Sequence, residues 1–329
     1  MIQRAKGTPK AIKIHNLSLP EFFARYGTEE QCRKHFESIK WPNGFVCPIC
    51  GETHTTYYGV KQIYECTACR HQTSLKAGTI IENSKLSLHQ WLLRMYLMAC
   101  TINGTSAAEL HRQVSIGYTA MKLNARKIKV AMAQRNLIYL LKGAVGMDEI
   151  FIGSPTKEAK RGLGTEKQQV VVLLSLKNGL FPNYLRLVPV VDATTITTSN
   201  VLLENVKIGS SLYGDEKTTY PSLRSHYKVT MEVNNYKEHP DQHQCINTVI
   251  SNFKSFLQGI YQGIEKKYLR LALTEFEWRF NRRSLGRHKM DAITRTVVGS
   301  HGITHRALVK MFSSGDDQLF RGQLLVPEL

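Results

Sequence analysis

Four cysteines stand in two Cys-x-x-Cys pairs, Cys47 with Cys50 and Cys66 with Cys69, and fifteen residues separate the pairs. Thiolates at this spacing are typical of a zinc ribbon, in which two knuckles close one tetrahedral metal site. The segment between the pairs is predicted to form a short hairpin, too small to fold without a metal. The pattern predicts a structural Zn²⁺ on all four thiolates, and the alternative is two disulfides or four unrelated thiols.

Two acidic residues are predicted to lie in or at the end of a strand, where a carboxylate is unusual. Asp148 lies within an apolar strand expected over residues 145–153, on the same face as Ile150 and Ile152. A carboxylate there is costly unless a metal ion or a partner satisfies it. Asp215 follows Gly214 at the end of a strand expected over residues 211–214, which places it at the carboxyl edge of the sheet, where α/β sites assemble. The plainer alternatives are an ion-paired acid for Asp148 and ordinary turn chemistry for Asp215.

A helix expected over residues 243–260 carries two further candidates beside a regular apolar stripe. Asn247 and Lys254 are seven residues apart, two turns up one face. An amide oxygen is a hard ligand suited to Mg²⁺ and an ammonium group contacts phosphate, whereas a solvated polar edge is the alternative. A competing acid, Asp192, is interpreted as the cap of the threonine-rich helix that follows it.

The composition points to an anionic partner. The 329 residues include 44 Lys plus Arg and 26 Asp plus Glu, so the formal net charge is +18. Such an excess favours binding to phosphate backbones, although a merely soluble basic protein would also show it. A length of 329 residues is enough for two or three small domains, and a hydrophobic fraction of 42% excludes wholesale disorder.

Several features favour the cytosol and argue against a membrane protein. Three cysteines outside the pairs, Cys32, Cys100 and Cys245, have no framework spacing and suggest reduced thiols. The first residues lack the apolar core of a signal peptide. The most apolar window, residues 91–100, is short and carries Arg94, so it is predicted to be a buried helix.

Helices are expected to surround the cysteine pairs. Residues 18–40 are predicted to be helical with a turn at Thr28, and residues 86–101 form another helix. Ser106 begins a helix to about residue 114, a turn with Gly117 follows, and a longer helix runs from Tyr118 to about Arg135. This plan is typical of a helix-turn-helix, although any packed helical hairpin looks similar. The exposed positions of its second helix are predicted to be Lys122, Asn124, Arg126, Lys127 and Lys129, and the basic ones to contact DNA.

Strands follow this helical region. Residues 145–153, 168–176, 185–191 and 211–214 are rich in β-branched residues, and helices are expected over 195–205 and 243–260. The predicted fold is multi-domain: a zinc ribbon plus a helix-turn-helix, then an α/β domain with a mixed sheet. The predicted boundaries are 1–40 for an N-terminal helical segment, 41–76 for the ribbon, 77–140 for the DNA-binding helices, 141–285 for the α/β domain and 286–329 for a C-terminal tail.

Five motifs together resemble bacterial insertion-sequence transposases of the ISXO-type group, which have an N-terminal zinc ribbon and an RNase H-like catalytic core. The resemblance spans about residues 20–283, and the motifs follow one another in the order of that family. They are Trp41–Cys50, Ala77–Lys85, Met147–Gly153, Gly214–Tyr220 and Thr274–Arg283.

The resemblance implies roles for the candidate residues. Asp148 and Asp215 would be the first two catalytic acids, and Asn247, seven residues before Lys254, would be the third position, with Asn252 as a rival. Two Mg²⁺ or Mn²⁺ ions would be bridged by the two aspartates, with Lys254 on the phosphate. The implied activity is Mg²⁺-dependent hydrolysis at the terminal inverted repeats of an element, followed by strand transfer into target DNA.

The implied partners are double-stranded DNA, at element ends and at the target, and a second copy of the chain in a homodimer or larger synaptic assembly. The implied location is the bacterial cytoplasm, at the nucleoid. One alternative is a zinc-ribbon and helix-turn-helix DNA-binding protein whose catalytic core has decayed, because Asn247 replaces the usual glutamate. Another is a zinc-ribbon protein of transcription or RNA processing, which leaves the acids on the strands unexplained.

Overall fold

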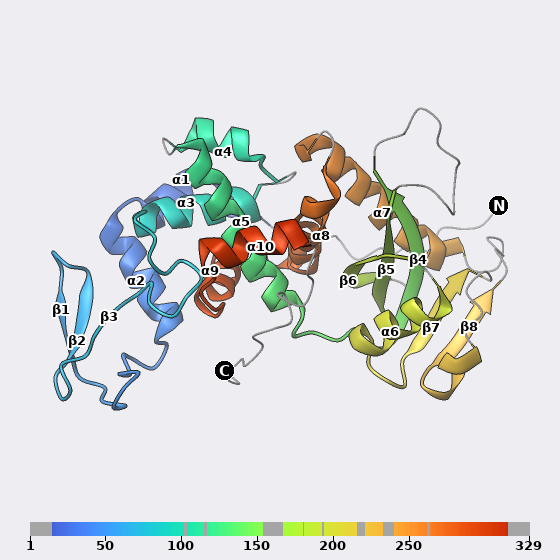
Figure 1. Cartoon of the computed structure of the whole chain (residues 1–329), viewed down its shortest axis with the longest axis horizontal. Helices are drawn as coiled ribbons and strands as arrows, with labels where there is room; N and C mark the ends of the chain where they lie inside the picture. The colour runs from blue at the N-terminus through green and yellow to red at the C-terminus, as the bar shows by residue number, and fades with distance from the viewer. Residues whose placement is uncertain are drawn as a thin grey trace, which may run out of the picture.

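The computed structural model of the chain describes residues 15–101, 104–114, 117–153, 167–179, 181–192, 194–215, 221–232, 240–261 and 264–314. Figure 1 shows the strands β1 to β3 at one end of the molecule, a group of helices in the middle and a larger sheet at the other end. None of the helices in the described ranges is both long and apolar enough to cross a membrane.

Two short helices, α1 (Leu19–Tyr26) and α2 (Glu29–Lys40), precede the cysteine pairs. Ser18 and Thr28 each begin one of them with a capping box, in which the hydroxyl accepts the backbone N–H three residues on. The helical stretch expected over residues 18–40 is therefore divided at Gly27, because Thr28 caps a second helix.

The ribbon is a small antiparallel sheet of β1 (Thr55–Tyr58), β2 (Ile63–Cys66) and β3 (Gln72–Ser74), in that spatial order. Its core is largely aromatic. Tyr64 is buried, and its ring lies 4.9 Å from that of Trp41 and 4.8 Å from that of Tyr57. The apolar interior of the ribbon is thus small and is shared with the residues that follow α2.

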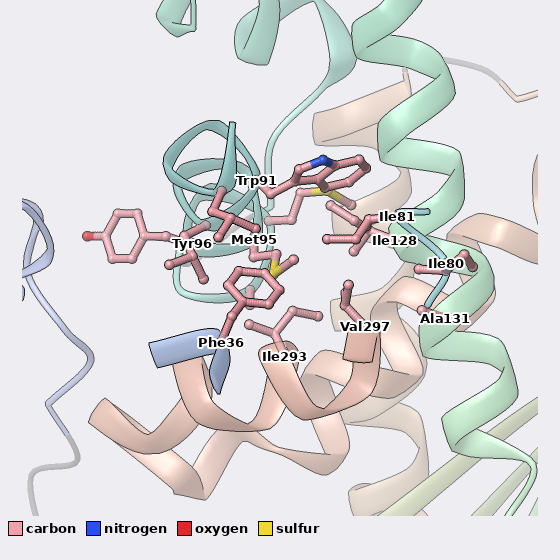
Figure 2. Close-up of a cluster of buried hydrophobic side chains, with 14 of the residues drawn as sticks. Phe36, Ile80, Ile81, Trp91, Met95, Tyr96, Ile128, Ala131, Ile293 and Val297 are labelled. Atoms are coloured by element: carbon pink, nitrogen blue, oxygen red, sulfur yellow. The ribbon is translucent and has the colours of Figure 1, made fainter. Parts of the chain in front are cut away.

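The middle of the molecule is a helical core built from both ends of the chain. It contains α3 (Leu88–Ala99), α4 (Ala107–Gln113), α5 (Tyr118–Asn136), α9 (Lys289–Val298) and α10 (His305–Ser314). Figure 2 shows Trp91 and Met95 of α3 meeting Ile128 of α5 and Val297 of α9.

Residues 286–329 were predicted to form a tail. Within this range α9 is packed against α2, α3 and α5, and its residues Ile293 and Val297 are fully buried. The packing of α9 is hard to predict from its sequence, because many of its residues are polar and only a narrow stripe of the helix is apolar.

The larger sheet has five strands in the order β6-β5-β4-β7-β8. Its strands are β4 (Ala144–Ile152), β5 (Gln168–Lys177), β6 (Phe181–Val190), β7 (Ser211–Asp215) and β8 (Lys228–Glu232). The first three pair antiparallel, with Asn178 and Gly179 at positive φ between β5 and β6, whereas β4, β7 and β8 pair in parallel. Strand β6 begins four residues earlier than predicted, and the polar edge strand β8 was not predicted.

Helices cover both faces of this sheet (Figure 1). On one face α6 (Thr195–Asn205) packs on Val145 and Met147, and on the other α7 (Pro240–Tyr261) and α8 (Lys266–Asn281) pack on Ile150 and Ile152. Two 3₁₀ segments, Pro221–Ser225 and Arg283–His288, complete the described elements. A mixed sheet flanked by helices confirms the predicted RNase H-like fold class.

Candidate functional site

The four predicted zinc ligands lie together. Their sulfur atoms are all within 4.8 Å of one another, with Cys47 Sγ 3.6 Å from Cys69 Sγ and Cys50 Sγ 3.5 Å from Cys66 Sγ. A disulfide needs about 2.05 Å, so these distances exclude the two-disulfide alternative. A tetrahedral Zn²⁺ with bonds of about 2.3 Å would space its sulfur ligands by about 3.8 Å. The donor set and its spacing therefore fit one zinc ion.

Both cysteine knuckles have the same backbone geometry. Gly51 N–H donates to Cys47 O at 3.0 Å, and Arg70 N–H donates to Cys66 O at 3.0 Å. Gly51 and Arg70 both have positive φ, 76° and 59°, so each pair is followed by the same tight left-handed turn. The repeated turn brings the two pairs of thiols to one point.

In the first knuckle the electrostatics favour the thiolate form of Cys47 but not of Cys50: although a backbone hydrogen bond from Glu52 acts to lower it, hydrogen bonds with the other three thiols raise the pKa of Cys50 to about 12. Desolvation acts to raise the pKa of the Cys47 thiol, but hydrogen bonds from the backbone amides of Cys50 and Ile49 help to lower that pKa to about 6. A thiol that loses its proton readily is a better metal ligand, because zinc binds the thiolate form.

The two predicted acids occupy neighbouring parallel strands. The pairing of β4 with β7 places Val145 level with Leu212 and Gly146 level with Tyr213. Continuing this register by two residues places position 148 level with position 215, on strands that lie about 4.8 Å apart. Level positions on adjacent parallel strands belong to the same face of the sheet, so the backbone puts both aspartates on one face. The side chain of Asp215 lies outside the described residues.

Asp148 and Glu149 lie on opposite faces of β4. Asp148 is half-buried on the α7 side, where one of its carboxylate oxygens accepts the Glu149 N–H at 2.7 Å. Glu149 is on the α6 side and accepts a hydrogen bond from Gln169 Nε2 at 3.2 Å. Burial and, to a lesser extent, the charge of Asp148 raise the pKa of Glu149. Two consecutive acids on one strand therefore have different environments, and only Asp148 faces α7.

Helix α7 presents its polar residues on two different edges. Asn247 and Lys254 are both exposed and project within about 20° of each other on the helix. Asn252, the rival third ligand, projects about 160° away from Lys254 and lines a cleft between α7, α4 and α8. The two candidate asparagines are therefore separated by the body of the helix.

The prediction that Asp192 is the cap of α6 is wrong, because the N-cap is Thr194, but Asp192 stabilises that cap. Its Oδ1 accepts hydrogen bonds from the hydroxyls of Thr194 and Thr197, at 3.0 and 2.8 Å, and from Thr194 N–H at 3.3 Å. These bonds, chiefly that from Thr197, lower the pKa of Asp192. Asp192 therefore acts from two residues before the N-cap.

The structure corrects the predicted DNA-contact face of α5. This helix packs against α4, α8 and α9, and Asn124 is buried rather than exposed. Lys129 lies inside the molecule, with its ammonium 2.8 Å from Glu275 Oε2 and 2.5 Å from the Tyr261 hydroxyl. Although burial acts against the ammonium ion, the Glu275 carboxylate raises the pKa of Lys129. Lys129 is therefore a buried ion-pair partner and cannot contact DNA.

The other three predicted contacts differ in their exposure. Lys122 is exposed near the start of α5. Arg126 is half-buried, with its guanidinium 4.7 Å from the centre of the Tyr268 ring. Burial lowers the pKa of Lys127, which is also half-buried. The basic pattern of α5 does not mark a DNA-contact face, because a central helix can carry cations that contact its neighbours in the fold.

Helix α8 joins the sheet to the helical core through the last motif of the sequence analysis. Glu277 is 4% exposed and pairs with Arg186 of β6 at 2.8 Å, and the same guanidinium donates to Asn136 O and Tyr139 O after α5. Asn281 exchanges two hydrogen bonds with the backbone of Leu185, at 2.7 and 3.0 Å. One face of α8 is thus bonded to the sheet.

The other face of α8 is bonded to the helices. Glu275 holds Lys129 of α5, Trp278 Nε1–H donates to Thr296 of α9 at 3.2 Å, and Arg279 donates to the carbonyls of Met98 and Thr101 after α3. In the sequence, the motif Thr274–Arg283 indicates only the family resemblance and not these contacts. Charged residues among the apolar residues of α8, such as Glu275, Glu277 and Arg279, are the sequence signal that could have indicated buried ion pairs.

Two protein-family models match the chain. The model of the ISXO2-like transposase domain matches residues 140–281, and that of the transposase zinc-ribbon domain matches residues 27–72. Together they cover more than half of the sequence. Residues 140–281 thus form an ISXO2-like transposase domain, which a transposase zinc ribbon precedes.

A relative of this chain is an uncharacterized protein in the transposable element ISH50 of Halobacterium salinarum. It is 28% identical over 138 residues, which are 41% of this chain and 45% of the relative. The chain therefore matches somewhat less than half of that protein.

Among solved structures, a pre-cleavage Mos1 transpososome is 12% identical, with 61% of this chain and 76% of that chain covered and a TM-score of 0.27. A Mos1 mariner paired-end complex with Mn is 13% identical, with 55% and 72% covered and a TM-score of 0.25. TM-scores this low carry no argument, so the fold assignment rests on the strand order and the family match.

Proposed function

We propose that this protein is a DNA transposase that cuts and joins phosphodiester bonds with Asp148, Asp215, Asn247 and Lys254. All four residues lie within the span of the matched transposase domain, residues 140–281. The observation that supports the proposal most is the parallel pairing of β4 with β7, whose register, if continued by two residues, puts positions 148 and 215 level on one face of the sheet.

The orientation of α7 supports Asn247 over Asn252 as the third member. The cleft that Asn252 lines also includes Phe181 and Pro182 at the start of β6, so that edge of α7 faces the β6 side of the sheet. Asn247 and Lys254 are on the opposite edge, which by the strand order is the side of β4 and β7. We therefore assign the third position to Asn247 and a phosphate contact to Lys254.

Asp148, Asp215 and Asn247 would hold Mg²⁺ or Mn²⁺, since carboxylate and amide oxygens are the ligands that these ions prefer. Such a pair of ions, when bound, activates the attacking water or DNA 3′-hydroxyl and stabilises the leaving oxygen. Lys254 would contribute a point charge that orients the phosphate for in-line attack. Because Asn247 is neutral where glutamate is usual, we expect the second cation to bind more weakly.

The ends of the element would be bound by α4 and the first turn of α5. His111 and Arg112 of α4 are exposed, and so are Thr119 and Lys122 at the start of α5. In a helix-turn-helix the first residues of the second helix reach the base edges, so the burial of Lys129 is compatible with this role. Strand transfer needs two DNA ends in one complex, so we propose that the transposase acts as a homodimer or larger assembly.

Cleavage of a duplex that carries the element's terminal inverted repeat, read from the DNA that flanks the gene, tests this proposal. With Mg²⁺ the wild-type protein is expected to cut at the end of the repeat. Asp148→Asn and Asp215→Asn should each lower the cleavage rate by about 10³-fold or more, with end binding changed by less than about twofold. Asp192→Asn is the matched control and should keep the wild-type rate, because that carboxylate only stabilises α6.

Near wild-type cleavage by either aspartate variant would exclude the assigned acids. If the wild-type protein binds the repeat but does not cut it with Mg²⁺ or Mn²⁺, the chain is a DNA-binding protein with a decayed catalytic core.

A further inference from the structure

A large cleft lies on the edge of α7 that faces away from Asn247. Its volume is about 1780 Å³, and its walls come from α4, the start of α5, α7, the end of α8 and the start of β6. Figure 1 shows α4 and α7 rising on either side of α8 at this place. Pockets for small molecules measure about 300–1,000 Å³, so this cleft has the size for part of a polymer.

The lining of the cleft is strongly cationic. Arg112, Arg279, Arg283 and Lys289 line it, whereas Glu109 is the carboxylate among the described residues that line it. Glu109 is already engaged, since it pairs with Arg112 at 2.6 Å and accepts a hydrogen bond from Gln113 at 2.7 Å. The cleft therefore presents net positive charge to whatever enters it, which favours an anionic occupant.

The position of Arg283 shows how this charge is held in place. Its Nη1 donates to Asn183 O at 3.0 Å and to Phe280 O at 2.9 Å, and its guanidinium lies 4.0 Å from the centre of the Phe280 ring. These partners are neutral, so they orient the guanidinium without cancelling its charge. A fixed cation beside a cleft is suited to a phosphate group.

Aromatic rings stand at two separate walls of the same cleft. Tyr118 at the start of α5 is 46% exposed, and Phe181 at the start of β6 is 65% exposed. Exposed aromatic faces between cations are the pattern by which proteins bind single-stranded nucleic acid, because unpaired bases stack on the rings. A duplex keeps its bases stacked on each other and gains little from such rings.

We propose that this cleft binds single-stranded DNA, separately from the catalytic edge of α7. The proposal rests on the proposed function, in which strand cleavage releases unpaired ends that need a place on the protein. Polar residues of α7 on this edge, Gln244, Thr248 and Asn252, then face the bound strand. Helix α7 serves two DNA segments, one on each edge.

Binding of a fluorescein-labelled oligothymidylate of about 12 nucleotides to the zinc-loaded, full-length protein tests the proposal, because single-strand sites span about 4–16 nucleotides. Phe181→Ala is expected to weaken this binding about tenfold, with less than twofold change for a duplex of equal length. Arg283→Gln should weaken it and reduce its dependence on salt by about 0.7 in the log–log slope. The matched control is Lys207→Gln, which removes an exposed charge after α6 and should leave both affinities unchanged.

Equal affinity of the wild-type and Phe181→Ala proteins for the oligothymidylate would overturn the proposal. The proposal would also be overturned if Phe181→Ala changed the sedimentation of the protein but not its binding of oligothymidylate. The cleft would then be a contact between copies of the protein. The binding assay needs no cleavage. Failure of the catalytic assignment is therefore distinguishable from failure of this site.

Discussion

The ribbon and the five-stranded sheet are both β-structures, but they are held together by different forces. The ribbon strands have 4, 4 and 3 residues, and the sheet strands β4, β5 and β6 have 9, 10 and 10. Residues 169–176 of β5 are buried without a break between helices on both faces. Strands as short as those of the ribbon bury too little apolar surface to offset the entropy of ordering them. The sheet is stabilised by its core, and we expect the ribbon to depend on a metal ion held by its four cysteines.

The two regions also differ in how they are attached to the helical core. The ribbon is attached through half-buried polar groups of α2: Arg33 donates to the Tyr64 hydroxyl at 3.2 Å, and Lys40 donates to the carbonyls of Ser74, Leu75 and Ala77. The sheet is attached by the fully buried ion pairs of α8. Because water competes with the first kind of contact and not with the second, we expect the ribbon to separate from the core more readily.

Removal of zinc should give the largest effect and should divide the molecule at this boundary. Structural zinc contributes about 10–16 kcal/mol to the folding of small domains, so Cys66→Ser or a chelator is expected to unfold residues 45–74. Hydrogen exchange checks this: amides of β1 to β3 should lose protection while those of β4 and β5 keep it, and bound zinc should fall below one ion per chain. Retained protection in β2 would show that the ribbon has a sufficient core of its own.

Removing the buried ion pair between Glu277 of α8 and Arg186 of β6 should give the next largest loss of stability. Glu277→Gln leaves the Arg186 guanidinium buried without its counter-charge, which costs about 3–5 kcal/mol of unfolding free energy. Urea denaturation measures the change. The matched control is Glu30→Gln, which removes a partner of Arg33 that is 55% exposed and should cost less than about 1 kcal/mol. Similar costs for the two variants would remove the distinction between the attachments.

The pH dependence of the ribbon attachment should give the smallest effect. Burial lowers the pKa of Lys40 from 10.5 to about 8, so in this pH range the unfolded chain binds more protons than the folded one. The contribution of Lys40 to unfolding free energy is therefore constant below about pH 8 and rises with pH up to about 10.5. Relative to Lys40→Met, the wild-type protein should gain about 2 kcal/mol between about pH 7.5 and 9.5. Denaturation curves of both proteins at the two pH values measure the gain, and parallel behaviour would refute the assigned pKa.

Features set by short stretches of chain were predictable. The spacing of Cys47, Cys50, Cys66 and Cys69 specifies the two knuckles, because the turn after each pair is local. The strands at residues 144–152 and 168–177 and the helix at 240–261 follow from their apolar periods. The local role of Asp192 at the start of α6 was predictable, because such bonds span a few residues, although the N-cap itself is Thr194.

Features that depend on distant partners were not predictable. The cations of α5 suggested a DNA-binding face, but the acid that pairs with Lys129 is Glu275, which is far away in the sequence. The period of a helix shows that it has faces without showing which neighbour each face meets. The helix over residues 289–298 was missed for the same reason, since its narrow stripe becomes a core only against α2, α3 and α5.

The amino-acid sequence by itself determined the metal ligands, the nature of most helices and strands, and the candidate residues for catalysis, because each of these depends on side-chain type and local spacing. Only the tertiary structure decided that β4 and β7 pair in parallel, which edge of α7 lines the cleft, and which basic residues are buried. Lys129 and Glu275, for example, are 146 positions apart, and α2 and α9, which pack together, come from opposite ends of the chain. The energies of such contacts arise from burial that exists only once the chain has folded.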